Sequence, residues 1–115
     1  MAGGFFRIAF TGANGSGLGI LVLHDGSVVG ADTGGGIYEG SYTENSDART
    51  LDFAVTLSLP AGATPVQTGI ALPAAMSVPI HSSVLENDLG SERPTLVQTP
   101  LGPVNALFKK IRDFP

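Results

Sequence analysis

The most restrictive feature of the sequence is the stretch from Gly17 to Tyr42, where an Asp-Gly pair and a triple glycine separate three apolar runs. An Asp-Gly pair between apolar runs is among the strongest local signals for a β-hairpin. The triple glycine indicates a second turn, because glycine adopts backbone conformations that other residues resist. We therefore predict consecutive strands at about 17–24, 27–33 and 37–43.

Two further segments alternate with a period of two, which is typical of strands and not of helices. In the segment 51–59, every second residue is large and apolar, which gives the cleanest pattern in the chain. In the segment 4–11, Phe6 and Phe10 share one face with other apolar residues, whereas Arg7 lies on the opposite face. Both segments are predicted to be strands with one face toward a core.

The region after residue 60 gives a weaker signal, because four prolines between residues 60 and 79 remove backbone hydrogen-bond donors. We expect irregular structure there, with a short helix or turn within 60–75. Strands are predicted at about 76–84 and 95–99, with a polar loop between them. Pro79 suggests that the first of these strands is an edge strand or carries a bulge.

The last segment, 104–114, fits two structures. Its apolar residues have helical spacing, and Pro103 precedes them at a position that a first helical turn tolerates. As a strand it is apolar on both faces at Leu107 and Phe108. We favour the strand, because a meander of seven strands needs an eighth to cover its exposed edge. The predicted fold is a single all-β domain, residues 1–115, with eight antiparallel strands in an up-and-down barrel.

Composition limits the classes of function. The chain of 115 residues is 43% apolar and 14% charged, with 16 glycines and 8 prolines, which fits short strands joined by turns. Its net charge of −4 offers no broad basic surface, so direct nucleic-acid binding is not expected. The absence of cysteine excludes disulfides and thiolate sites. With no signal-peptide pattern and no run long enough to span a membrane, we expect a cytoplasmic protein.

No pattern of reactive residues indicates a catalytic or metal site. The glycines at 12–19 lack the spacing and the Lys of a phosphate-binding loop. The histidines, His24 and His81, do not form a metal-binding pair, and no serine lies in a G-x-S-x-G motif. We expect no catalytic residue, no metal and no cofactor, and we rank an enzyme behind the other classes.

Asp32 is the polar residue with the most specific setting, since it precedes the glycines at 34–36. Its carboxylate is expected to accept hydrogen bonds from those glycine amides or from a tyrosine hydroxyl, and the alternative is contact with a ligand. Six aromatic residues are candidates to line an apolar cavity or to form an ordinary core: Phe6, Phe10, Tyr38, Tyr42, Phe53 and Phe108. An eight-stranded barrel can be filled or can hold one small ligand, and the sequence leaves both open.

The stretch from Gly17 to Tyr42 contains, in order, Gly17-x-Gly19, an apolar strand, the turn glycine Gly26, Gly30-x-Asp32 and Tyr38-x-Gly40. In these motifs it resembles the GrlR-type family, negative regulators of type III secretion. Supporting matches are Gly4-x-Phe6-x-Ile8-x-Phe10 and the run Pro100-Leu101-Gly102-Pro103-Val104-Asn105. The resemblance is specific over residues 3–42 and weak over residues 60–95.

This resemblance implies a lipocalin-like barrel that forms a homodimer, has an interior able to accept an apolar molecule, and acts by binding a transcriptional activator. The family's regulator uses a loop of alternating Glu and Asp for that contact. The matching residues are Glu44, Asn45, Ser46 and Asp47, of which only the outer two are acidic. We therefore place first a non-enzymatic regulatory protein that binds a protein partner through its loops or an exposed strand edge. The alternative is a carrier or sensor of a small apolar ligand.

Overall fold

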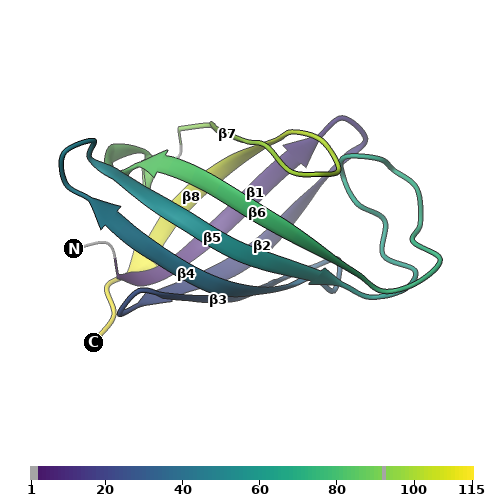
Figure 1. Cartoon of the computed structure of the whole chain (residues 1–115), viewed down its shortest axis with the longest axis horizontal. Coiled ribbons are helices and arrows are strands. Elements are labelled where there is room, and N and C mark those ends of the chain that lie inside the picture. The colour runs from purple at the N-terminus through teal and green to yellow at the C-terminus, as the bar shows by residue number, and fades with distance from the viewer. Residues whose placement is uncertain (1–2, 92) are drawn as a thin grey trace.

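The computed structural model describes residues 3–91 and 93–115, and its eight strands form one antiparallel sheet that curls into a nearly closed barrel (Figure 1). This architecture confirms the predicted all-β, eight-stranded up-and-down barrel. In chain order the described elements are β1 (Gly4–Gly12), β2 (Gly15–His24), β3 (Ser27–Asp32), β4 (Ile37–Asn45), β5 (Thr50–Leu59), β6 (Met76–Leu85), the 3-10 turn η1 (Glu86–Asp88), β7 (Thr95–Val97) and β8 (Val104–Arg112).

The turn between β2 and β3 has the hairpin geometry that its Asp-Gly pair predicts. Asp25 and Gly26 have φ angles of +48° and +81°, and a two-residue type I′ turn needs positive φ at both central positions. β4 extends past its predicted end at residue 43, because Glu44 and Asn45 pair with the start of β5. The turn that follows is correspondingly shorter than the loop expected from the sequence.

The ambiguous terminal segment forms the strand β8, as favoured, and it pairs with β1 from Phe5 opposite Arg112 to Thr11 opposite Asn105. Phe108 is buried in the interior, while Leu107 is half-buried on the outer face. The segment 60–75 contains turns and no helix. Tertiary pairing with β1 therefore decides the conformation of a segment whose apolar spacing also fits a helix.

The ring of strands is interrupted at one seam. The strands follow the order β6-β5-β4-β3-β2-β1-β8-β7, and no described pairing joins β6 to β7. β7 is only three residues long, so it covers little of the edge of β8, with which it pairs. Pro79 lies on β6, which is an edge strand as predicted, where the missing N–H of a proline is tolerated.

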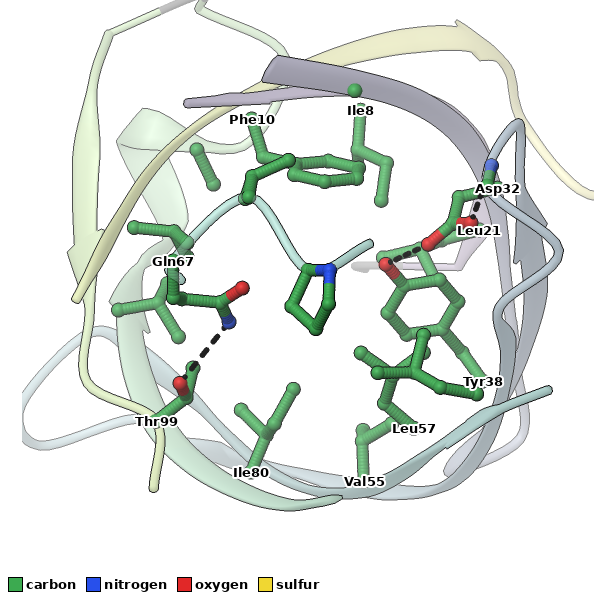
Figure 2. A pocket seen from close by; sticks show the side chains of 18 of the residues that line it. Ile8, Phe10, Leu21, Asp32, Tyr38, Val55, Leu57, Gln67, Ile80 and Thr99 are labelled. Atoms are coloured by element: carbon green, nitrogen blue, oxygen red, sulfur yellow. Dashed lines mark hydrogen bonds between the residues drawn. The ribbon is translucent and has the colours of Figure 1, made fainter. Parts of the chain in front are cut away.

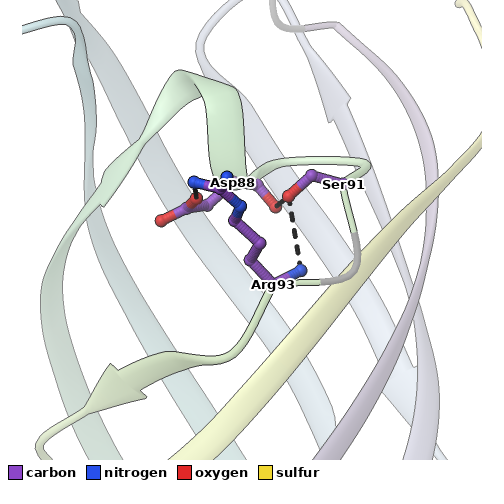
Figure 3. A network of polar contacts seen from close by, with 3 residues as sticks. All are labelled: Asp88, Ser91 and Arg93. Atoms are coloured by element: carbon purple, nitrogen blue, oxygen red, sulfur yellow. Dashed lines mark hydrogen bonds and ion pairs between the residues drawn. The ribbon is translucent and has the colours of Figure 1, made fainter.

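The connection across this seam folds back on itself and on β8. The backbone oxygen of Asp88 accepts a hydrogen bond from the Ser91 hydroxyl at 3.1 Å, and the Arg93 amide donates to the same hydroxyl at 3.3 Å (Figure 3). An Arg93 nitrogen lies 3.9 Å from a carboxylate oxygen of Asp88. The Gly90 amide also donates to the Phe108 carbonyl at 3.0 Å, which fixes the connection against β8.

The two ends of the barrel are packed differently. The end where β1 begins contains the largest fully buried side chains, which close it: Phe6, Leu23, Val28, Leu51 and Val84. We call this the packed end; the start of β1 and the C-terminus lie at this end in Figure 1. The segment 60–75 lies at the opposite end, which we call the hollow end.

Candidate functional site

A cavity of about 260 Å³ occupies the hollow end of the barrel interior. Every strand contributes to its wall, and the packed end forms its floor through Val28 and Val84. Its apolar lining consists of Ile8, Phe10, Leu21, Val28, Tyr38, Phe53, Val55, Leu57, Leu59, Ala63, Pro65, Val66, Ile80, Val84, Val97, Val104, Ala106 and Phe108. Figure 2 shows labelled side chains from opposite strands facing one another across this space.

A glycine on the inner face of β2 helps to keep this half of the barrel open. Gly17 lies opposite Phe10, and a Cβ at position 17 would lie 2.4 Å from an atom of the Phe10 ring. The glycine thus lets the ring lie close to the wall of the barrel instead of filling its centre. Phe53, Val55 and Ile80 point inward yet are only half-buried, since they border the cavity.

The six aromatic candidates divide between the two ends of the barrel. Phe10, Tyr38, Phe53 and Phe108 line the cavity. Phe6 and Tyr42 are not among the lining residues and form ordinary core, the alternative that the sequence left open: Phe6 is fully buried in the packed end, and Tyr42 is buried there beside Phe53, with ring centroids 6.2 Å apart. The alternation of a strand identifies the inward face, but it does not tell which end of that face is hollow.

Asp32 forms a polar cluster in the cavity wall. Its Oδ1 accepts hydrogen bonds from the amides of Gly34 at 3.0 Å and Gly36 at 2.9 Å. Its Oδ2 accepts a hydrogen bond from the Tyr38 hydroxyl at 2.7 Å (Figure 2). Both types of contact expected from the sequence are present, and Asp32 and Tyr38 also border the cavity.

The glycines around Asp32 leave space for its carboxylate. A Cβ at Gly36 would lie 2.6 Å from Oδ2, so a larger residue there would displace the carboxylate. Burial raises the pKa of the Tyr38 hydroxyl far above its usual range, and the hydrogen bond and charge of Asp32 raise it further. Tyr38 therefore remains protonated and able to donate to Asp32 in neutral solution.

Residues 60–75, which we call the lid, close on themselves across the hollow end. The Gly62 amide donates to the Leu72 carbonyl, and the Leu72 amide donates to the Ala63 carbonyl, both at 2.8 Å. Between these bonds, Pro65 is buried and lines the cavity. The lid is therefore a compact loop with a hydrogen-bonded base, and its central proline borders the cavity.

Two turns at the rim hold the lid. The backbone amide of Asn14, in the turn between β1 and β2, donates to the Val66 carbonyl at 2.8 Å, and its side chain donates to the Gln67 carbonyl at 3.0 Å. The Gln67 side chain donates to the Thr99 hydroxyl at 3.2 Å (Figure 2). Sequence reasoning missed Asn14, Gln67 and Thr99, because their contacts join irregular segments that are 53 and 32 residues apart.

The charge of the cavity wall is set by one residue. The residues that line it include no Lys, Arg, His or Glu, and Asp32 is the carboxylate among them. The Thr99 hydroxyl is engaged, since it accepts from the Leu101 amide at 3.2 Å and donates to the Gly102 carbonyl at 2.6 Å. The interior is thus apolar with one acidic point at Asp32.

The residues proposed for partner binding, Glu44 to Asp47, lie at the packed end, away from the cavity. They do not form the predicted loop as a unit: Glu44 and Asn45 belong to β4, and only Ser46 and Asp47 lie in the turn. All four are exposed. The side-chain oxygen of Asn45 accepts a hydrogen bond from the Ala48 amide at 3.2 Å, which shapes the turn.

The histidines lie outside the cavity. His24 stacks on Phe114, with ring centroids 3.9 Å apart, and His81 is exposed on β6. Within residues 3–91 and 93–115, no group of three or more His, Cys, Asp or Glu side chains is placed to hold a metal ion. In the same part of the chain, no helix is both long and apolar enough to cross a membrane.

Comparison of the chain with models of protein families, with curated proteins and with solved structures finds no match. The resemblance to the GrlR-type family therefore rests on the motifs of residues 3–42 and remains a proposal.

Proposed function

We propose that this protein is a non-enzymatic carrier or sensor that binds one compact apolar molecule inside the barrel. The observation that carries the proposal is the apolar cavity of about 260 Å³ at the hollow end. A well-packed core leaves few voids larger than a water molecule, so an unfilled space of this size is costly unless a ligand occupies it. Apolar concave sites with a few polar groups are the usual form of small-molecule sites.

The volume limits the size of the ligand. An engineered apolar cavity of about 150 Å³ in another protein holds benzene. On that scale, a cavity of about 260 Å³ accepts roughly ten non-hydrogen atoms, which corresponds to a medium-length alkyl chain or a fused two-ring compound. Burial of about eight methylene groups at about 0.8 kcal/mol each gives a dissociation constant in the range of tens to hundreds of micromolar.

The test is a calorimetric titration with 1-octanol, with native mass spectrometry to count bound molecules. We expect one site per chain. Val55→Phe places a larger side chain in the cavity and should weaken binding by at least about tenfold. The control is Leu96→Phe, which also introduces a phenylalanine but at a position on β7 that is 57% exposed. Equal binding by the wild type and Val55→Phe would place the ligand elsewhere and refute the proposal.

A second proposal, protein–protein contact through the outer face, is supported by a separate observation. Leu18, Ile20, Val29 and Ile37 are between 43% and 52% exposed on the neighbouring strands β2, β3 and β4. Exposed apolar side chains in one contiguous area are typical of interaction sites. We infer that this face binds a second copy of the chain, in line with the dimeric regulator that the family resemblance implies.

Charge complementarity supports a symmetric dimer. Exposed Arg7 lies beside this face, opposite Ile20, and exposed Glu39 lies on the other side, opposite Val29. A two-fold axis through the face would bring Arg7 of each copy toward Glu39 of the other. Such pairs would fix the orientation of the two copies more than they would add affinity.

Sedimentation velocity tests this second proposal. Ile20→Glu should weaken self-association by at least about tenfold, because it buries a charge in the contact. Ser77→Glu, at an exposed position on β6, is the control. Arg7→Glu should weaken the dimer, and the addition of Glu39→Arg should restore it. A wild-type monomer at all concentrations would contradict the proposal.

A further inference from the structure

The Asp32 carboxylate in the cavity wall can accept more hydrogen bonds than the protein donates to it. Each carboxylate oxygen can accept about two. Oδ1 of Asp32 is occupied by the amides of Gly34 and Gly36, whereas Oδ2 accepts only from Tyr38. The Tyr38 hydroxyl uses its hydrogen for that bond, so its oxygen can also accept. This part of the wall therefore presents acceptors to a ligand, at Oδ2 of Asp32 and at the Tyr38 oxygen.

An anionic head group would find no charged partner in the same space. The lining residues include no Lys, Arg or His, and Asp32 would repel a carboxylate or phosphate. The repulsion is strong, because charges interact more strongly in a poorly hydrated interior than in water. A fatty acid, the ligand that a barrel of this size suggests at first, is thus a poor match for this interior.

We propose that the cavity selects compact apolar molecules that carry a hydrogen-bond donor, an ammonium or a hydroxyl group, which binds Oδ2 of Asp32, and that it rejects carboxylates of the same length. The inference rests on the proposed ligand-binding function and adds the chemical class of the ligand. An amine pairs its charge with Asp32, whereas an alcohol donates a neutral hydrogen bond to it. The rest of either molecule lies against the apolar lining.

Three eight-carbon ligands test this selectivity in the wild-type protein: octylamine, 1-octanol and octanoate, titrated calorimetrically at pH 7. We expect octylamine and 1-octanol to bind at one site, with octanoate at least about 100-fold weaker than octylamine. If 1-octanol and octanoate bind equally, the selectivity is refuted while the cavity function stands. If none of the three binds, the proposed function itself fails.

Two variants assign the selectivity to Asp32. Asp32→Asn has nearly the same shape as the wild type but no charge at this position. It should reduce the preference for octylamine over octanoate by roughly 30-fold or more, and it should change the affinity for 1-octanol by less than about threefold. Tyr38→Phe removes the donor that occupies Oδ2, and octylamine should bind to it at least as tightly as to the wild type. An equal loss of all three ligands in Asp32→Asn would show that Asp32 only shapes the cavity. Weaker octylamine binding in Tyr38→Phe with 1-octanol binding unchanged would also overturn the proposal.

Discussion

Replacement of Asp32 by alanine tests whether this residue holds the wall of the cavity together. The substitution removes the acceptor for three hydrogen bonds, from the Gly34 and Gly36 amides and the Tyr38 hydroxyl. The Gly34 amide is exposed, so water replaces its partner at little cost. The other two donors are partly buried, and Tyr38 itself is only 9% exposed.

The expected loss of stability follows from those two donors. A partly buried donor that loses its acceptor costs about 1–2 kcal/mol. The free energy of unfolding of Asp32→Ala should therefore fall by about 2–4 kcal/mol. For a chain of 115 residues, 1 kcal/mol corresponds to about 4 °C in the melting temperature, so the melting temperature should fall by about 8–16 °C.

Urea denaturation followed by circular dichroism measures the free energy, and thermal melting checks the shift. Asp52→Ala is the matched control, because the Asp52 carboxylate also accepts two hydroxyl hydrogen bonds, from Thr50 at 3.0 Å and Ser83 at 2.7 Å. The Ser83 bond is exposed, so the control should lose less than about 1 kcal/mol. If Asp32→Ala is no less stable than Asp52→Ala, Asp32 does not have the structural role described above.

Further predictions concern the tyrosine hydroxyl, the packed end and the lid. Burial and Asp32 raise the pKa of the Tyr38 hydroxyl, so as the pH rises the unfolded chain loses this proton before the folded chain does. The contribution of Tyr38 to the free energy of unfolding is therefore complete below about pH 10, and above that pH it should fall by up to about 1.4 kcal/mol per pH unit. Urea midpoints between pH 9 and 11 should show this loss in the wild type and a smaller one in Tyr38→Phe. Leu51 is 0% exposed, and Leu51→Ala should lower the free energy of unfolding by about 3–5 kcal/mol in urea titrations; a loss below about 1 kcal/mol would contradict tight packing there. A Cβ at Gly12 would lie 2.6 Å from the Val66 carbonyl oxygen, so Gly12→Ala should push the lid outward. The rate of 1-octanol release, measured from NMR line shapes, should then rise roughly fivefold. An unchanged rate would show that the ligand does not leave past the lid.

The strands and the principal turns are predictable from the sequence because their signals are local. The Asp25-Gly26 turn needs only two residues that tolerate positive φ, and both adopt it. The alternation in residues 51–59 places Leu51, Leu57 and Leu59 in the core. The strand over 104–112 lacks a decisive local signal, since its apolar spacing also fits a helix and only pairing with β1 decides between them.

The candidate site is less accessible to sequence reasoning, because it depends on residues that are distant along the chain. Phe6 and Phe10 are both aromatic and both face inward on β1, yet only Phe10 borders the cavity. The difference arises from their neighbours: Phe10 lies opposite Gly17, whereas Phe6 lies opposite Leu21. The lid contact between Gln67 and Thr99 has no periodic pattern to indicate it, since both residues lie in turns or irregular backbone.

The seam between β6 and β7 has a consequence for how the protein folds. The ladder of β1 with β8 joins residues as far apart as Phe5 and Arg112, and contacts between such distant segments slow folding. A circular permutant that joins the end of β8 to the start of β1 and opens the chain within residues 86–94 would place every hydrogen-bonded pair of strands next to each other in sequence. The same barrel would then be a simple meander, and stopped-flow refolding should show that it forms faster than the natural connectivity.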